Sequence, residues 1–254
     1  MKQTFFISAI TLLLGMGQCA MADGDIAAGK AKAVTCAGCH GPDGNGTDNP
    51  AWPKLASQHP AYIVKQLRDF KARETRKDPI MSDQAAQLSE QDMLDLAAYF
   101  SRQKIKIGTA DDNLAEHGGN VYRTRITTDS GNTINACIDC HGRVGAGKKN
   151  KNYPRLAGQN AAYIAKALRD FRSGRRSNDN GKVMRMIASH LSDDDIDAVA
   201  SYIQGMGNYS RFVWPVYIIA LLIMVANLVS PSRQEKQIIR NLKRKQRRES
   251  RGMQ

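Results

Sequence analysis

The chain has 254 residues, with 37 Lys and Arg against 24 Asp and Glu and a formal net charge of +13. This length allows only one or two small domains. Residues 23–210 carry 26 basic and 22 acidic residues, a net charge of only +4, whereas residues 233–251 carry nine basic and two acidic residues. No aromatic residues are interleaved with the basic ones in that tail, which argues against nucleic-acid binding.

Residues 1–22 predict a cleaved secretory signal peptide. A lysine precedes a long uncharged run, and the small residues Ala20 and Ala22 indicate cleavage directly after them. Cys19 would be removed with this leader. A lipoprotein anchor on Cys19 is the alternative, but the residue before it is a poor match to that signal.

The strongest chemical signal is a Cys-x-x-Cys-His pentapeptide that occurs twice, 101 residues apart. Its members are Cys36, Cys39 and His40 in the first copy and Cys137, Cys140 and His141 in the second. Two thiols at this spacing can bond the two vinyl groups of one porphyrin, and the next imidazole can bind the iron. A four-cysteine zinc site or a redox dithiol would not need a histidine after each pair. The sequence therefore predicts two covalently bound haem c groups, with both histidines as axial ligands.

Each pentapeptide lies within a longer repeat. Residues 53–70 match residues 154–171 with the same offset of 101. The second copy also has an insertion around residues 124–135 that is rich in Thr, Asn, Asp, Ser and Gly, so we expect a surface loop there. The repeat predicts two domains, residues 23–108 and residues 109–208.

Apolar residues recur at helical spacing in both copies. Ile63, Leu67 and Phe70 lie at i, i+4 and i+7, and the pattern returns 101 residues later. A capping signature at Ser89, and again at Ser192, predicts the start of the last helix of each copy. No strand-like alternation competes, so we predict an all-α fold. Such small domains bury little core from protein atoms alone, and each haem would supply the rest.

Met81 and Met184 are the expected sixth ligands of the two irons, because each lies seven residues before a leucine that the repeat matches. Apolar packing is the alternative for any methionine near a haem, and Met186 is the alternative ligand in the second copy. His59 aligns with Asn160 and so has no matched partner. Histidine and methionine together close both axial positions and raise the reduction potential relative to two histidines, which favours an electron carrier.

Residues 24–207 resemble the dihaem cytochrome c4 family. The resemblance is carried by both haem motifs, both methionines and the two Pro-x-Leu-Ala-x-Gln-x-x-x-Tyr segments. The resemblance implies two class I cytochrome c domains in tandem, related by a pseudo-twofold axis, with the haem propionates near their interface. It also implies one-electron transfer in the periplasm. Within each domain, the carbonyl of Pro53 or Pro154 would accept a hydrogen bond from Nδ1 of His40 or His141 and orient the imidazole.

The chain continues past the region of resemblance. Residues 212–232 are an uncharged run that is long enough to cross a bilayer as a helix, and Trp214 and Tyr217 lie near its start, where an aromatic belt is expected. Pro215 and Asn227 weaken this interpretation. A buried helix of a globular domain is the alternative.

The basic tail, residues 233–254, indicates a topology. Because positive residues remain on the cytoplasmic side, we predict a C-terminal transmembrane helix in the cytoplasmic (inner) membrane, with a cytoplasmic tail and with the haem domains in the periplasm. Only residues 205–211 would link the last haem-domain helix to this single span, so the domains would stay close to the membrane.

Two classes of function compete at this point. The favoured one is a membrane-anchored dihaem cytochrome that carries single electrons between a quinol:cytochrome c oxidoreductase and a haem-copper oxidase or other terminal reductase. It would act as a tethered carrier or as a fixed subunit of a respiratory complex. The alternative is a dihaem peroxidase-type enzyme, which needs one iron with an open sixth position, and both Met81 and Met184 count against it. We expect no catalytic residues, no small-molecule substrate and no nucleic-acid partner.

Overall fold

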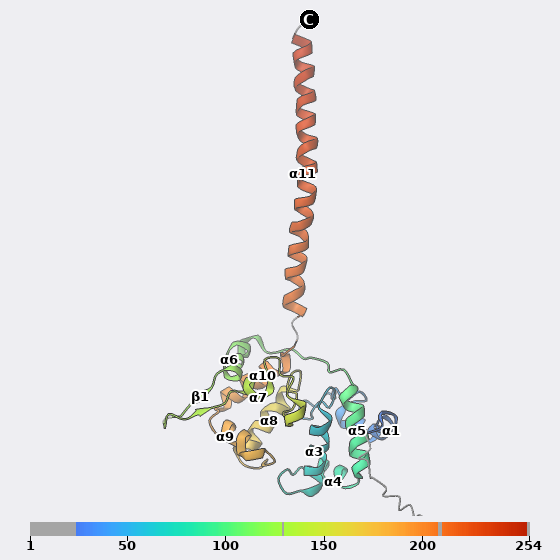
Figure 1. The fold of residues 1–254 in the computed structure, drawn as a ribbon, viewed down its shortest axis with the longest axis vertical. Coiled ribbons are helices and arrows are strands. Elements are labelled where there is room, and N and C mark those ends of the chain that lie inside the picture. Colours follow the sequence, from blue (N-terminus) through green and yellow to red (C-terminus); the bar gives the residue numbers. More distant parts are fainter. Residues whose placement is uncertain (1–23, 129, 208–209, 253–254) are drawn as a thin grey trace, which may run out of the picture.

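The computed structural model describes residues 24–128, 130–207 and 210–252, so the predicted signal peptide lies outside the described residues. Two helical domains lie side by side, and a long helix extends away from them (Figure 1). An extended segment, residues 103–110, connects the last helix of the first domain to the first helix of the second.

The two domains repeat one arrangement of helices. The first domain contains α1 (Ile26–Lys32), the 3-10 helix η1 (Ala33–Cys36), α2 (Ala37–His40), α3 (Pro60–Ala72), α4 (Pro79–Ala86) and α5 (Glu90–Arg102). The second contains α6 (Asp112–Arg123), α7 (Cys137–His141), η2 (Lys149–Lys151), α8 (Ala161–Arg172), η3 (Asn180–Lys182), α9 (Val183–Ser189) and α10 (Asp193–Gly205).

The insertion in the second copy differs from the expected loop. It contains two short strands, β1 (Ile126–Thr127) and β2 (Thr133–Ile134), which pair antiparallel. Ile134 is buried while the turn between the strands carries polar residues. The fold is therefore mostly helical with one small hairpin. The sequence did not predict this hairpin, because strands of two residues are too short to show an alternating pattern.

Both capping signatures are confirmed. Ser89 accepts from the backbone N–H of Asp92, whose carboxylate accepts from the Ser89 N–H, and Ser192 and Asp195 form the same reciprocal pair. These caps satisfy N–H groups that have no partner within the helix, so they fix the start of α5 and α10.

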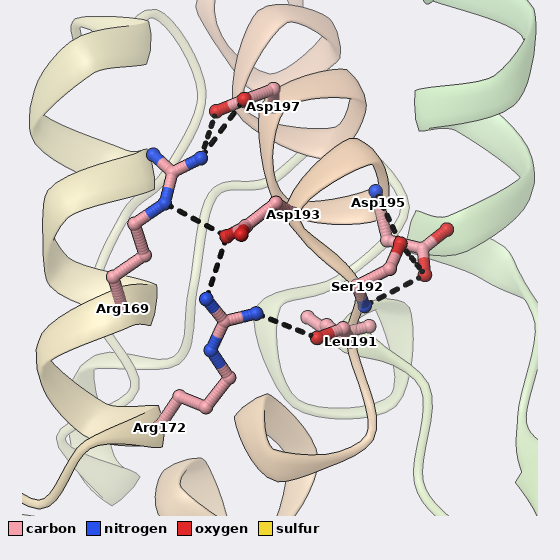
Figure 2. Close-up of polar contacts among 7 residues, drawn as sticks. All are labelled: Arg169, Arg172, Leu191, Ser192, Asp193, Asp195 and Asp197. Atoms are coloured by element: carbon pink, nitrogen blue, oxygen red, sulfur yellow. Dashed lines mark hydrogen bonds and ion pairs between the residues drawn. The ribbon is translucent and has the colours of Figure 1, made fainter.

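A cluster of charged groups joins α8 to the N-terminal turn of α10 (Figure 2). Arg169 contacts the carboxylates of Asp193 and Asp197, at 3.1 and 2.9 Å, and Arg172 contacts Asp193 at 2.6 Å and the carbonyl of Leu191 at 3.0 Å. Carboxylates at a helix N-terminus also complement the helix dipole. Because these groups are largely exposed, they orient the two helices rather than contribute much stability.

Each domain has its own hydrophobic core, and the predicted apolar faces of α3 and α8 are part of it. The buried residues of the first core include Ile63, Val64, Met93, Leu96 and Phe100. Those of the second include Tyr122, Leu168, Ile196, Val199 and Ile203.

The first and last helices of each domain cross at a glycine. A Cβ on Gly29 would lie 2.0 Å from the carbonyl oxygen of Asp95, and a Cβ on Gly118 would lie 2.0 Å from that of Ala198. Any side chain at these positions would separate α1 from α5, or α6 from α10. The close crossing therefore requires glycine at both positions.

The predicted transmembrane helix, and with it the inner-membrane localisation, is wrong. Residues 212–232 are part of α11 (Ser210–Gly252), one 43-residue helix that continues through the basic tail. No helix among the residues that the structure describes is long and apolar enough to cross a membrane.

We expect Gly118→Ala to destabilise the second domain, because its Cβ would collide with the Ala198 carbonyl. Overpacking of this kind costs about 1–3 kcal/mol, which chemical denaturation of the haem-loaded protein can measure. Gly119→Ala is the matched control in the same helix. Its Cβ would meet only the flexible end of Arg123 at 2.7 Å, and alanine favours the helix by up to about 1 kcal/mol. Equal unfolding free energies for the two variants would contradict this account of the crossing.

Candidate haem-binding sites

Each domain buries one histidine whose ring is held by a proline carbonyl. Nδ1 of His40 lies 2.8 Å from the carbonyl oxygen of Pro53, and Nδ1 of His141 lies 3.0 Å from that of Pro154. A carbonyl oxygen can only accept, so Nδ1 carries the proton and Nε2 keeps a lone pair for a metal. Burial lowers the pKa of both histidines, against the opposing effect of the carbonyls, and so favours the neutral imidazole that a metal requires.

The loop between each histidine and its proline is held in the same way in both domains. The N–H of Gly46 donates to the carbonyl of His40 at 2.7 Å, and the N–H of Gly147 donates to that of His141 at 2.9 Å. The glycine directly after each histidine has a φ of +77° or +79°, which ends the short helix and starts the loop. The position of each imidazole therefore follows from local backbone geometry.

The four cysteines of the described chain form no disulfide, and two of them lie on the short helical turn before each of these histidines. Burial raises the pKa of Cys36, and it raises the pKa of Cys137 to about 11. A redox dithiol has a lowered pKa, so this environment does not fit one. The described residues also include no group of three or more His, Cys, Asp or Glu side chains placed to hold a metal ion, which counts against the zinc alternative.

The methionines at matched positions both lie near the start of a short helix. Met81 belongs to the first turn of α4, where its N–H donates to the capping carboxylate of Asp78 at 3.0 Å. Met184, at the start of α9, is half-buried and packs against the second core. Met186 is 46% exposed. The structure thus separates the two candidate methionines of the second copy, one facing the core and one facing solvent.

A glutamine from each domain binds the backbone of the other domain. Gln58 accepts from the N–H of Arg155 at 2.9 Å and donates to its carbonyl at 3.0 Å. Gln159 accepts from the N–H of Lys54 at 2.7 Å and donates to its carbonyl at 2.8 Å. Arg155 and Lys54 directly follow the two prolines that hold the histidines. The backbone next to each proline that orients a histidine is therefore hydrogen-bonded to the neighbouring domain.

Two buried arginines extend this reciprocal interface. Arg76 of the first domain donates to the hydroxyl of Tyr163 at 2.9 Å, and Arg176 of the second donates to that of Tyr62 at 2.8 Å. Each guanidinium also lies over the ring of the last phenylalanine of the preceding helix in its own domain, 4.1 and 4.4 Å from the ring centroid. The amide oxygen of Gln66 accepts from both arginines. Hydrogen bonds and rings thus compensate for the burial of two like charges.

Sequence reasoning missed these interface roles. It used the repeated Pro-x-Leu-Ala-x-Gln-x-x-x-Tyr segment as a family signature only. The signal was nevertheless present, because Gln58 and Tyr62 recur as Gln159 and Tyr163 although neither pair belongs to the i, i+4, i+7 apolar pattern of the repeat. A polar residue that recurs off the apolar face needs a partner elsewhere, and here the partner is the other domain.

The donor set of each domain fits haem c. In each domain, two thiols and one imidazole with an unprotonated Nε2 lie within five consecutive residues of a short helical segment. Attachment to one porphyrin requires this arrangement. The fold and these two sites define a tandem c-type cytochrome.

Comparisons with known proteins agree with this class. The family model described as cytochrome c matches residues 26–104 and 129–207. A second model, described as heme exporter protein D (CcmD), matches residues 207–250, which include most of α11. The long helix therefore lies outside the cytochrome match.

Individual relatives narrow the family. Cytochrome c4 of Azotobacter vinelandii is 45% identical over 208 residues, which are 78% of this chain and 97% of the relative. The crystal structure of reduced recombinant cytochrome c4 from Pseudomonas stutzeri superposes with a TM-score of 0.67 at 44% identity and covers 72% of this chain and 99% of that one. A thiosulfate dehydrogenase electron acceptor of Stutzerimonas stutzeri (strain A1501) is 36% identical over 69% of this chain and 80% of its own length.

The chain belongs to the cytochrome c4 family. It is accordingly an electron-transfer protein with two covalently bound haem c groups rather than an enzyme.

Proposed function

We propose that this cytochrome passes single electrons between redox enzymes, with one haem held in each of the domains 23–108 and 109–208. The thioether bonds would come from Cys36 and Cys39 in the first domain and from Cys137 and Cys140 in the second, and the axial ligands would be His40 with Met81 and His141 with Met184. When bound, each haem supplies an iron that gains and loses one electron. The carbonyls of Pro53 and Pro154 would keep each imidazole in its orientation.

The observation that carries this proposal is the matched pair of buried histidines, each of which donates from Nδ1 to a proline carbonyl. Each domain also has a methionine at the same position of the repeat, Met81 or Met184. Nitrogen and sulfur ligands on opposite sides would close both irons. A closed iron exchanges electrons without binding a small substrate, so the peroxidase alternative has no support from either site.

The half-buried position of Met184 supports it over Met186 as the second sulfur ligand. A side chain that packs against the core beside Cys137 could reach an iron held by His141, whereas one that faces solvent could not. Met186 has its side chain 46% exposed and its carbonyl in a hydrogen bond with His190, which suits a surface position.

The donor and the acceptor are part of the proposal. A quinol:cytochrome c oxidoreductase and a haem-copper oxidase or other terminal reductase fit a one-electron carrier with closed irons. The similarity to a thiosulfate dehydrogenase electron acceptor, 36% identical over 175 residues, supports thiosulfate dehydrogenase as a second donor.

Met184→Ala and Met186→Ala test the ligand assignment. We expect Met184→Ala to remove the share of the far-red sulfur-to-iron absorption band that comes from one of the two oxidised haems, and to lower one of the two reduction potentials, because a thioether favours the reduced iron. Met186→Ala should leave the band and both potentials unchanged. A full band in Met184→Ala, or a weakened one in Met186→Ala, would show that the assignment is wrong.

Reduction kinetics test the carrier function. The oxidised protein is mixed with quinol:cytochrome c oxidoreductase plus quinol, or with thiosulfate dehydrogenase plus thiosulfate, and haem reduction is followed by absorbance. We expect catalytic amounts of at least one donor enzyme to reduce both haems, and the reduced protein to be reoxidised by a terminal oxidase. Hydrogen peroxide should not be turned over. If the protein consumed hydrogen peroxide and neither donor enzyme reduced its haems, the peroxidase-type function would replace the carrier function.

A further inference from the structure

Two buried nitrogen atoms at the domain interface have no hydrogen-bond partner. They are Nε2 of His59, from the first domain, and Nε of Arg155, from the second, and they are the only such side-chain atoms among the described residues. His59 is 8% exposed. A buried donor without an acceptor costs about 1–3 kcal/mol, and more if it is charged. Arg155 Nε always carries a hydrogen, and His59 Nε2 carries one when the imidazole is protonated, so one acceptor from outside the polypeptide would satisfy both atoms.

The two side chains belong to a prepared site. The amide oxygen of Gln58 accepts from the backbone N–H of both His59, at 3.0 Å, and Arg155, at 2.9 Å. One glutamine therefore fixes the backbone beneath both unpaired nitrogens, although they come from different domains. These two hydrogen bonds hold the backbone in place before anything binds, which lowers the entropic cost of binding.

This site adjoins the haem-binding loop of the second domain. Ala146, whose carbonyl lies beside the ring of His59, is in the loop that runs from His141 to Pro154, and Arg155 is the next residue after that proline. Lys149, from the same loop, adds a positive charge that acts on His59. An occupant would therefore meet two cations and the imidazole at the rim of the second haem site.

Haem carries only one kind of group that suits such donors. Its ring, methyl groups and thioether links are apolar, whereas its two propionates are carboxylates that accept hydrogen bonds from N–H groups. We propose that His59 Nε2 and Arg155 Nε bind a propionate of the haem in the second domain, so that the first domain supplies a titratable group to the second haem. This rests on the proposed attachment of that haem at Cys137, Cys140 and His141.

The first site lacks an equivalent. There Lys54 takes the place of Arg155 and Asn160 takes the place of His59. Both have partners within the chain, since Lys54 Nζ donates to the carbonyl of Lys106 at 2.6 Å and Asn160 Nδ2 donates to that of Trp52 at 2.8 Å. Asparagine also does not titrate. The proton-linked contact is therefore confined to the second haem.

The expected consequence is a pH-dependent potential for one haem only. A proton on His59 places positive charge near the haem, which disfavours the more positive oxidised state and raises the reduction potential. As the pH rises through the pKa of His59, this potential should fall. Before a propionate is counted, burial lowers the pKa of His59, the Ala146 carbonyl opposes that effect, and Lys149 and Arg155 lower the pKa further. A propionate would raise it toward or above its ordinary value.

The test is a redox titration of the haem-loaded full chain from about pH 5 to about pH 9, on either side of the ordinary histidine pKa of about 6.5. We expect one of the two potentials to fall with pH in the native protein and neither to fall in His59→Asn, which introduces the residue that the second copy has at this position. His190→Asn, at an exposed histidine, is the matched control and should behave like the native protein. The pH-dependent potential should be the one that Met184→Ala shifts.

The outcomes separate this inference from the proposed function. Each variant is first checked for two covalent haems per chain, and His59→Gln replaces His59→Asn if the latter does not fold. With two haems present, an unchanged pH dependence in the His59 variant, or a pH dependence in neither haem of the native protein, overturns the propionate site alone. If removing Cys137 and Cys140 left two covalent haems, the proposed attachment itself would be wrong.

Discussion

The structure depends above all on two reciprocal contacts in which a glutamine side chain binds the backbone of the opposite domain. Gln58 uses both ends of its amide on Arg155, and Gln159 does the same on Lys54. Because the bound residues directly follow Pro53 and Pro154, the same few atoms set the docking of the domains and support the carbonyls that orient the histidines. A change in how the domains dock would therefore alter the support of the histidine at both haem sites.

The reciprocal arrangement also explains why the repeat retains certain polar residues. Because the contacts between the two domains are reciprocal, a residue that crosses the interface from one copy is needed again in the other. Tyr62 and Tyr163 each accept from the arginine of the opposite domain, in the same way as the glutamines. The differences between the copies then become informative. The second haem site has His59 and Arg155, whereas the first has Asn160 and Lys54 at the matched positions. This difference distinguishes two otherwise similar sites.

Local features of the fold could be predicted from sequence because neighbouring residues determine them. The capping boxes at Ser89 and Ser192, the apolar faces of α3 and α8, and the haem motifs all depend on short spacings. The interface could not be predicted in this way, since periodicity does not say which domain a glutamine contacts. The hairpin at Ile126–Thr127 was missed because its strands are too short for a pattern. The span at 212–232 was predicted from the length of an uncharged run and its basic flank, whereas no helix among the described residues, α11 included, is long and apolar enough to cross a membrane.

Amide hydrogen exchange at Lys54 and Arg155 in a Gln159→Leu variant tests the central constraint most directly. The account predicts that the Lys54 amide, which has lost its acceptor, exchanges at least about fivefold faster than in the native protein, equivalent to about 1 kcal/mol. The Arg155 amide keeps Gln58 and should change much less. An unchanged exchange rate at Lys54 would mean that the glutamine contact does not hold the domains together, and would contradict the account.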